Sequence, residues 1–147
     1  MKQYQAYPVT FDVENARFRF QSIGKRGVFD KIVEFIPISP NIHNLALLDY
    51  DLTTNKYSDI SVTDNGDMPE VIATVIAIIQ RFLDSNPGQK IYFEGSTVAR
   101  TRLYQIAISQ VFDPGDSDLL IEGYKDGQWV LFEPNIRFEG FLVKKKF

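Results

Sequence analysis

The spacing of apolar residues changes at Gly66, and this change constrains the fold more than any other feature of the sequence. Upstream, the run from Arg17 to Gln21 alternates and places Phe18 and Phe20 on one face, as in a half-buried β-strand. Downstream, apolar residues recur with the spacing of one helical face. They are Met68, Val71, Ile72, Val75, Ile76, Ile79, Phe82 and Leu83. Strands and helices that occupy separate stretches of a chain are typical of the α+β class.

Turn residues divide the first half of the chain into predicted strands. The G-K-R-G sequence at 24–27 predicts a hairpin, because glycine tolerates a positive φ. Pro37 and Pro40 are expected to end the second strand, and T-T-N-K at 53–56 forms the next turn. The four strands begin at Arg17, Val28, Leu45 and Tyr57, and the last ends at Thr63. Because short turns join them, they are expected to form an antiparallel meander.

Local signals bound two helices in the second half. For the first helix, Asp67 is the expected N-cap, Pro69 fits the first turn and Pro87-Gly88 ends the element. A short apolar run, 90–94, predicts a central strand, and the second helix follows G-S-T and continues to about Phe112. Its expected buried stripe is Leu103, Ile106, Ala107 and Val111.

The C-terminal third is predicted to return to strands. After a loop at 113–117, K-D-G at 125–127 lies between two short apolar runs and predicts a hairpin. A last strand covers 137–143. The three lysines that follow it, 144–146, are expected on a sheet edge or tail, where they would discourage edge-to-edge pairing.

The predicted order is ββββ-α-β-α-βββ, in a single domain over residues 1–147. We therefore expect an α+β fold with a mixed or mainly antiparallel sheet of about seven or eight strands and both helices on one face. The strands followed by α-β-α also resemble the ribonuclease-H-like arrangement, a likeness of fold that implies no activity.

Composition excludes several classes of function. The chain has no cysteine, which removes disulfides, thiolate nucleophiles and cysteine-based metal sites and favours a reducing, cytoplasmic environment. A net charge of -3 argues against binding to an extended nucleic-acid duplex. No apolar run reaches the roughly 18 residues that span a bilayer, and the first residues do not resemble a signal peptide, so we expect no membrane association.

The candidate site is the junction between the 90–94 strand and the second helix. Gly95 is followed by Ser96 and Thr97, either of which can cap the helix, and by Arg100 and Arg102 in its first turns. A helix N-terminus carries about half a positive charge and attracts anions, so two arginines there need a negative partner. A ligand phosphate or carboxylate would supply it, bound by Ser96, Thr97, Arg100 and Arg102.

The same pattern has an alternative interpretation, in which a protein carboxylate braces the corner. Glu94, Asp113 or another carboxylate would then pair with either arginine. Neither G-x-x-x-x-G-K-[ST] nor G-x-G-x-x-G occurs in the chain, so the junction is not one of the common phosphate-binding loops.

Other candidate centres are weaker. The acids Asp49, Asp51, Asp59 and Asp64 supply oxygen ligands for a divalent cation, but they flank turns where Asp is favoured in any case, so we expect no metal or cofactor. His43 is the only histidine and is expected in a solvated loop. Carboxylate pairs of the glycosidase type, Glu122 with Glu133 or Glu139, show no specific spacing. Trp129 is better explained by packing than by base stacking.

Six segments carry a resemblance to a known family. They are A-Y-P-V near the start, N-L-A-L-L-D-Y-D, D-N-G-D before A-T-V-I-A-I-I, G-S-T-V-A-R-T-R-L-Y, D-G-Q-W and F-L-V-K-K-K. The chain is similar over almost its whole length to a family of small bacterial proteins, mainly from Bacteroidetes, that forms a domain of unknown function. In that family Pro often stands where this chain has Val98, and a basic residue where it has Gln105. The resemblance implies a cytosolic bacterial domain and no particular activity.

Three functions fit the sequence. The first is a non-enzymatic binding or accessory module. Its helix N-terminus and the pair Arg100 and Arg102 would accept an anionic group from a small molecule, a nucleotide or the carboxylate of a protein partner. The second is an enzyme that acts on a phosphorylated or nucleic-acid substrate, with the arginines stabilising charge and Asp49 or Asp51 acting as base or metal ligand. The third is a structural or interaction protein. The oligomeric state is left open.

Overall fold

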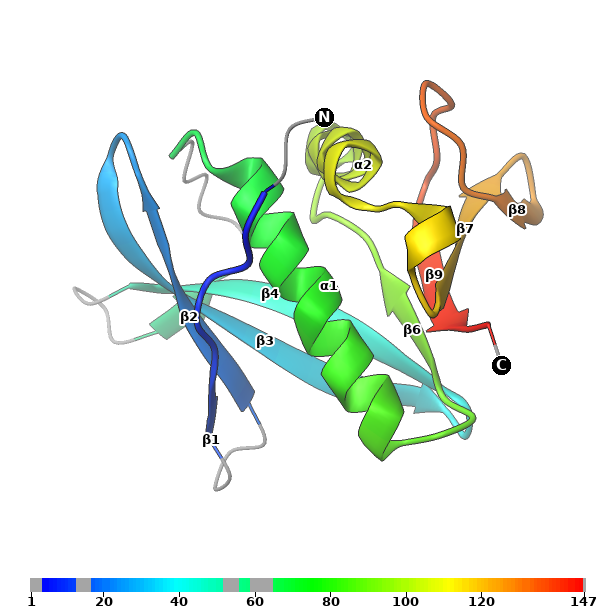
Figure 1. Ribbon diagram of the computed structural model, residues 1–147, viewed down its shortest axis with the longest axis horizontal. Helices are drawn as coiled ribbons and strands as arrows, with labels where there is room; N and C mark the ends of the chain where they lie inside the picture. Colours follow the sequence, from blue (N-terminus) through cyan, green and yellow to red (C-terminus); the bar gives the residue numbers. More distant parts are fainter. Residues whose placement is uncertain (1–3, 13–16, 52–55, 59–64, 147) are drawn as a thin grey trace.

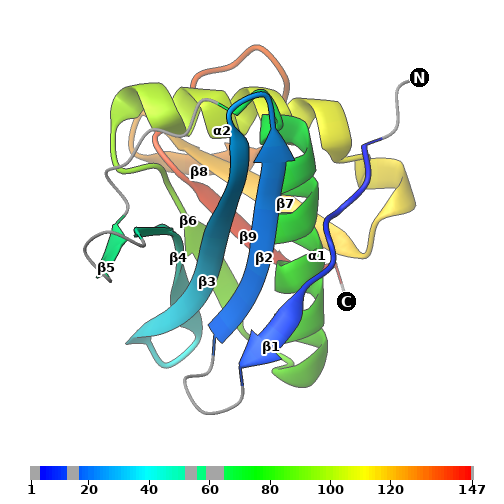
Figure 2. The ribbon, with the colours of Figure 1, turned by 90° about the vertical axis from the view of Figure 1, so that its left-hand side faces the viewer.

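The computed structural model describes residues 4–12, 17–51, 56–58 and 65–146. They form one nine-stranded mixed sheet with two α-helices packed on one face (Figures 1 and 2), which confirms the expected α+β class and helix order. The helices are α1, Met68–Ser85, and α2, Val98–Val111. The strands are β1 Thr10–Asp12, β2 Arg17–Gly24, β3 Gly27–Ser39, β4 Ile42–Asp51, β5 Lys56–Ser58, β6 Lys90–Phe93, β7 Leu119–Lys125, β8 Gln128–Leu131 and β9 Phe141–Lys145.

The strand order is β1-β2-β3-β4-β6-β9-β7-β8, and β5 pairs with the end of β4. Strands β2, β3 and β4 form the predicted antiparallel meander. Helix α1 then crosses the sheet and brings β6 parallel to β4, whereas β9 lies antiparallel between β6 and β7. The core therefore lies between one sheet face and the two helices (Figure 1).

The β2–β3 hairpin uses its two glycines for different reasons. Gly27 has φ 120°, a conformation that L-residues with a side chain rarely adopt. At Gly24 a Cβ would lie 2.0 Å from the carbonyl oxygen of Asn65, so the close approach of another segment requires glycine there. Both hairpin glycines are thus fixed by the fold.

Strand β3 does not end at Pro37, contrary to the sequence prediction, but continues to Ser39 with an irregular register between Pro37 and Ser39. In the described part of the chain, the pairing of β2 with β3 reaches as far as Arg17, opposite Glu34. From Phe35 onward the described partner of β3 is β4, and a proline without an N–H is tolerated where a strand has a partner on one side.

Helix α1 confirms the predicted amphipathic pattern. Its fully buried residues are Val71, Ile72, Thr74, Val75, Ile78, Ile79 and Leu83. Met68, Ile76 and Phe82, which were also predicted, are partly buried against the same core. The N-terminal segment runs alongside the helix (Figure 2), and the Tyr7 N–H donates to Thr74 Oγ1 at 2.8 Å.

Two further predictions concern the segments that lead into this helix. Asp67 is the N-cap residue of α1, as predicted, but its side chain makes no capping hydrogen bond, because its carboxylate accepts hydrogen bonds from Tyr7 and Ser22. The predicted fourth strand appears as β5, Lys56–Ser58, and its expected continuation to Thr63 falls outside the described residues.

Helix α2 buries only part of the predicted stripe: Ala107 is 1% exposed and Val111 packs against the core, as predicted. Leu103 and Ile106 are 47% and 42% exposed. The buried residues are Thr101, Tyr104, Gln105, Ala107 and Ile108. The buried amide of Gln105 donates to the carbonyl oxygen of Ile136 and accepts from the Phe138 N–H at 3.1 Å. Because the fold supplies partners for this polar side chain, the helix is rotated away from its most apolar stripe.

The C-terminal strands confirm the predicted hairpin and correct the position of the last strand. Asp126 and Gly127 have φ of 51° and 79°, as a two-residue hairpin turn requires. The last strand, Phe141–Lys145, lies inside the sheet and includes Lys144 and Lys145, so these two lysines are not at an edge. Instead, Lys144 pairs with Glu122 at 3.4 Å and Lys145 with Asp84 at 2.5 Å.

Candidate functional site

The corner between β6 and α2 is held by a compact set of hydrogen bonds. Thr97 is the N-cap, and its Oγ1 accepts from the Arg100 N–H at 3.1 Å. Thr101 Oγ1 donates to the Thr97 carbonyl oxygen at 3.1 Å and accepts from the Gly95 N–H at 3.0 Å. A Cβ on Gly95 would lie 2.6 Å from the Thr101 nitrogen, so only glycine fits. The corner therefore presents the N-terminus of α2 in a fixed orientation.

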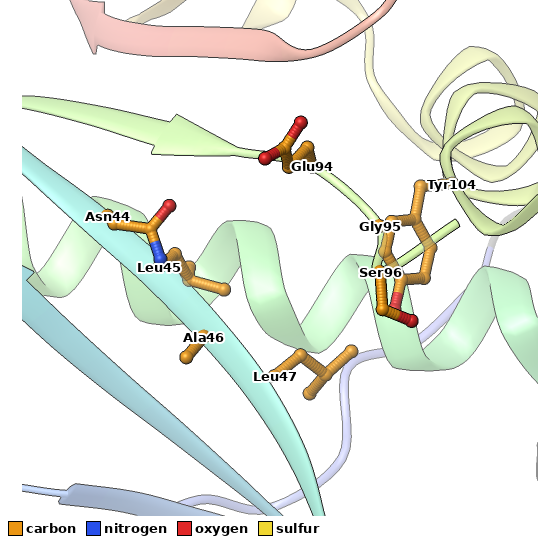
Figure 3. A pocket seen from close by; sticks show the side chains of 8 residues that line it. All are labelled: Asn44, Leu45, Ala46, Leu47, Glu94, Gly95, Ser96 and Tyr104. Atoms are coloured by element: carbon orange, nitrogen blue, oxygen red, sulfur yellow. The ribbon is translucent and has the colours of Figure 1, made fainter. Parts of the chain in front are cut away.

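A cavity of about 150 Å³ lies between this corner and β4 (Figure 3). One wall is the 44–47 stretch of β4, and the other consists of Glu94, Gly95, Ser96 and Tyr104. Tyr104 is 6% exposed and stacks on Phe93 with 4.9 Å between ring centroids, which fixes the position of its ring. Ser96 is exposed, so the cavity opens to solvent beside its hydroxyl.

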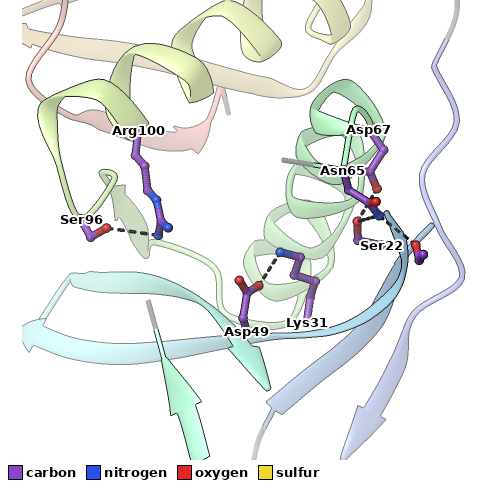
Figure 4. A network of polar contacts seen from close by, with 8 residues as sticks. Ser22, Lys31, Asp49, Asn65, Asp67, Ser96 and Arg100 are labelled. Carbon is purple, nitrogen blue, oxygen red and sulfur yellow. Dashed lines mark hydrogen bonds and ion pairs between the residues drawn. The ribbon is translucent and has the colours of Figure 1, made fainter. Parts of the chain in front are cut away.

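Arg100 contacts Ser96, one of the residues that line this cavity. Its Nη1 donates to Ser96 Oγ at 3.2 Å (Figure 4), and the side chain is half-buried. Arg100 and Tyr104 are four residues apart and therefore lie on the same side of α2. The structure thus brings together Ser96, Thr97 and Arg100, three of the four residues predicted for an anion site.

Arg102 does not join this group. Successive residues of an α-helix are rotated by about 100°, so Arg102 is about 200° around the axis from Arg100. It lies on the flank of α2 that faces away from Tyr104, and its side chain is half-buried there. The helix geometry therefore places Arg100, and not Arg102, on the side of Ser96, and a role of Arg102 in binding stays a prediction.

The carboxylates that were considered as braces make their hydrogen bonds elsewhere. Glu94 Oε2 accepts from the Tyr92 hydroxyl at 3.1 Å, and the Glu94 carboxylate points away from β4 (Figure 3). Burial, followed by the charge and hydrogen bond of Glu94, raises the pKa of Tyr92 to about 12. Asp113 Oδ1 accepts from the Gly115 N–H at 3.0 Å. Glu94 and Asp113 thus each accept a hydrogen bond from a group other than Arg100 and Arg102.

A family of unknown function, DUF6934, matches residues 3–146. The chain belongs to this family. The match includes β4, the β6–α2 corner and α2, so every wall of the cavity lies within the DUF6934 domain. No curated protein and no solved structure matches the chain. In the described part of the chain, no helix is both long and apolar enough to cross a membrane.

A buried ion pair lies on the same sheet face as the corner, and sequence analysis did not identify it. Lys31 is 8% exposed, and its Nζ bonds Asp49 Oδ1 across β3 and β4 (Figure 4). Lys31 alternates with the core residues Val33 and Phe35, so the strand period was a signal that this lysine faces inward. Asp49, which the sequence analysis considered as a cation ligand and set aside, therefore has an ammonium group as a partner.

The remaining candidates are dispersed. His43 is not in a loop, as predicted, but in β4, where its ring lies 5.1 Å from that of Phe82. The side chains of Asp51, Asp59 and Asp64 fall outside the description, and the described residues contain no cluster of three metal-binding side chains. Trp129 is 39% exposed and packs edge-on against Tyr124 and Tyr92, so it lies at the surface of the sheet.

Proposed function

We propose that this DUF6934 domain is a non-enzymatic binding module that accepts a small anionic group at the start of α2. The observation that carries the proposal is the 3.2 Å hydrogen bond from Arg100 to Ser96 at the rim of the cavity. It places a permanent cation and a hydroxyl donor beside the positive end of a helix dipole. These are the groups that recognise phosphate and carboxylate.

The binding chemistry follows from the groups at the start of α2. Thr97 Oγ1 accepts from the Arg100 N–H, and the N–H groups of Val98 and Ala99 belong to the first turn, which has no intrahelical acceptors for them. The guanidinium fork offers parallel N–H donors to two oxygens of one anion. We expect the anion to displace the Arg100–Ser96 contact and to take one donor from each residue.

The cavity limits the size of the bound group. A water molecule occupies about 30 Å³ of liquid, so about 150 Å³ holds a phosphate or carboxylate with a few attached atoms. A larger ligand, such as a nucleotide, would leave most of its atoms outside. We therefore propose that the domain recognises a terminal anionic group, either of a small molecule or of a protein partner.

The enzyme alternative depends on Asp49, which shares a sheet face with the corner (Figure 4). Its carboxylate is held by Lys31, and both side chains are largely buried, at 10% and 15% exposure. A general base needs a free lone pair directed at its substrate. The ion pair therefore supports binding over catalysis. We further propose a bacterial, cytoplasmic setting, on the absence of cysteine and the family likeness described above.

Thermal unfolding in phosphate tests the proposal, with chloride at equal ionic strength as the reference. Phosphate is expected to raise the Tm of the wild type and of Arg102→Ala, but not that of Arg100→Ala. At a ligand concentration of 100 Kd the gain is about 2.7 kcal/mol. Equal phosphate shifts in all three proteins would contradict the proposal, because salting effects act on the whole surface.

A purely structural corner predicts a different pattern. Arg100→Ala would then lower the Tm without any ligand, and the wild type would show no specific response to phosphate. The comparison with Arg102→Ala controls for the loss of one positive charge from the same helix.

A further inference from the structure

Among the described residues, strand β8 pairs with β7 alone and forms one end of the strand order (Figure 1). The Phe132 N–H donates to the Ile121 carbonyl oxygen at 3.0 Å, which fixes the alternation of the ladder. Val130 therefore directs its backbone groups to β7, whereas Trp129 and Leu131 direct theirs outward. The edge therefore presents the backbone N–H and C=O groups of two residues, Trp129 and Leu131.

The side chains of this edge are unusual for a protein surface. All four residues of β8 are exposed, and Trp129, Val130 and Leu131 are 39%, 37% and 60% exposed. Residues 128–132 contain no charge, although a quarter of the chain is charged. Open edges are normally protected by charged residues or proline, and β1, at the other end of the sheet, carries Asp12. An uncharged apolar edge is expected to be covered.

We infer that β8 pairs with β8 of a second copy of this chain, in an antiparallel register centred on Val130. In that register the outward backbone groups of Trp129 meet those of Leu131 in the partner, and the reverse. The pairing is isologous, so it closes as a two-fold dimer and leaves no further edge of the same kind.

The side chains complement one another in the same register. Trp129 and Leu131 lie on the sheet face of Tyr92 and Tyr124, so each Trp129 packs beside a Leu131 of the second copy. Val130, on the opposite face, meets its own symmetry mate. Gln128 lies opposite Phe132, so no like charges face each other across the pair. Each exposed apolar side chain of β8 thus gains an apolar neighbour.

The cysteine-free sequence allows a direct test by disulfide formation. Val130 occupies a non-hydrogen-bonded position of the proposed pair, where facing Cα atoms are about 4.5 Å apart, within the range of a disulfide. Val130→Cys is therefore expected to form a covalent dimer on mild oxidation, as measured by non-reducing electrophoresis. In light scattering, the wild type should show a concentration-dependent dimer.

Leu131→Cys is the matched control, because the adjacent residue is more exposed. In the proposed register the two copies of residue 131 are offset along the strand and lie about 8 Å apart, which is too far for a disulfide. We expect cross-linking of Val130→Cys to be at least about tenfold faster.

Two results would overturn the inference. One is cross-linking of Leu131→Cys at the same rate or faster, which indicates random collision or another register. The other is a wild type that stays monomeric at high concentration with an unreactive Val130→Cys variant, which would leave the edge to a peptide of a different protein. Neither result bears on phosphate binding at α2, which does not involve β8.

Discussion

The hydroxyl of Tyr7 donates a 2.6 Å hydrogen bond to the carboxylate of Asp67, sixty residues further along the chain. The same Oδ2 accepts from the Ser22 hydroxyl at 2.5 Å. Asp67, the residue that precedes α1, therefore connects the start of this helix to the N-terminal segment and to β2. Its side chain serves this tertiary contact and not the helix cap that its position suggested.

Asp67→Ala is expected to lower stability, because it removes the acceptor of the buried Ser22 hydroxyl. It also removes the shorter of the two hydrogen bonds of the Tyr7 hydroxyl and leaves the one to the Ile23 carbonyl oxygen. The cost of an orphaned buried hydroxyl is about 1–3 kcal/mol, and each kcal/mol corresponds to a Tm change of about 2–4 °C at this size. Thermal denaturation measures the loss. The exposed Asp118→Ala is the control and should change stability by less than about 0.5 kcal/mol. Equal effects of the two substitutions would show that the Asp67 contacts contribute nothing.

Two tyrosines give the fold a sensitivity to alkaline pH. Burial, followed by the hydrogen bond to Asp67, raises the pKa of Tyr7 to about 12, and the pKa of Tyr92 is raised to about 12 as well. Their neutral forms are favoured in the folded state. The stabilisation is present below pH 10 and is lost as the pH rises from about 10 to 12.

Urea denaturation across this interval should show stability falling with pH. The Tyr7→Phe, Tyr92→Phe double variant removes both titrations and should flatten the profile. An unchanged slope in that variant would assign the alkaline loss to other groups.

Three consecutive residues of α1 differ in burial and so allow a graded test of how this helix packs on the sheet. Ile78 is 1% exposed, Ile76 is partly buried and Ala77 is exposed. Aspartate at 78 places an unpaired charge in the core and should cost more than about 4 kcal/mol, enough to unfold the domain. Circular dichroism should rank stability in the order Ala77→Asp, Ile76→Asp, Ile78→Asp, from highest to lowest. A folded, normally melting Ile78→Asp variant would contradict the packing of this helix.

Structural elements were predicted correctly where the sequence carries a strong local pattern. Helix α1 and the two hairpins were predictable, because long apolar periodicity and turn glycines are local signals. The buried face of α2 was predicted only in part, because burial of Gln105 depends on the backbone of Ile136 and Phe138, which are distant in sequence. The interior position of β9 likewise follows from pairing with β6, which no local pattern encodes.

The same distinction between local and long-range features applies to the candidate site. The Gly95-Ser96-Thr97 corner was recognisable from its residues, and Thr97 does cap the helix. The helical period alone separates Arg100 from Arg102, so this part of the geometry was available from the sequence. The wall that β4 contributes to the cavity was not, because it requires the parallel pairing of β4 with β6.

The β6–α2 corner supplies a test of its rigidity. Gly95→Ala places a methyl group 2.6 Å from the Thr101 nitrogen, so the capping hydrogen bonds must shift. We expect a loss of about 1–3 kcal/mol and a weakened phosphate response, measured by thermal shift. Gly115→Ala is the matched control, since its nearest non-neighbouring atom is at 3.5 Å. A Gly95→Ala variant as stable as Gly115→Ala would show that the corner is not tightly packed.

The most direct test of anion binding is a phosphate titration of the ¹⁵N-labelled protein, followed by amide chemical shifts at constant ionic strength. The amides of residues 96–101 should shift saturably in the wild type and in Arg102→Ala, because the proposed anion contacts the first N–H groups of α2. Arg100→Ala should lose the saturable response at these amides while keeping the rest of its spectrum. Small, linear shifts scattered over the surface, or the same saturable shifts in Arg100→Ala, would contradict an anion site built on Arg100.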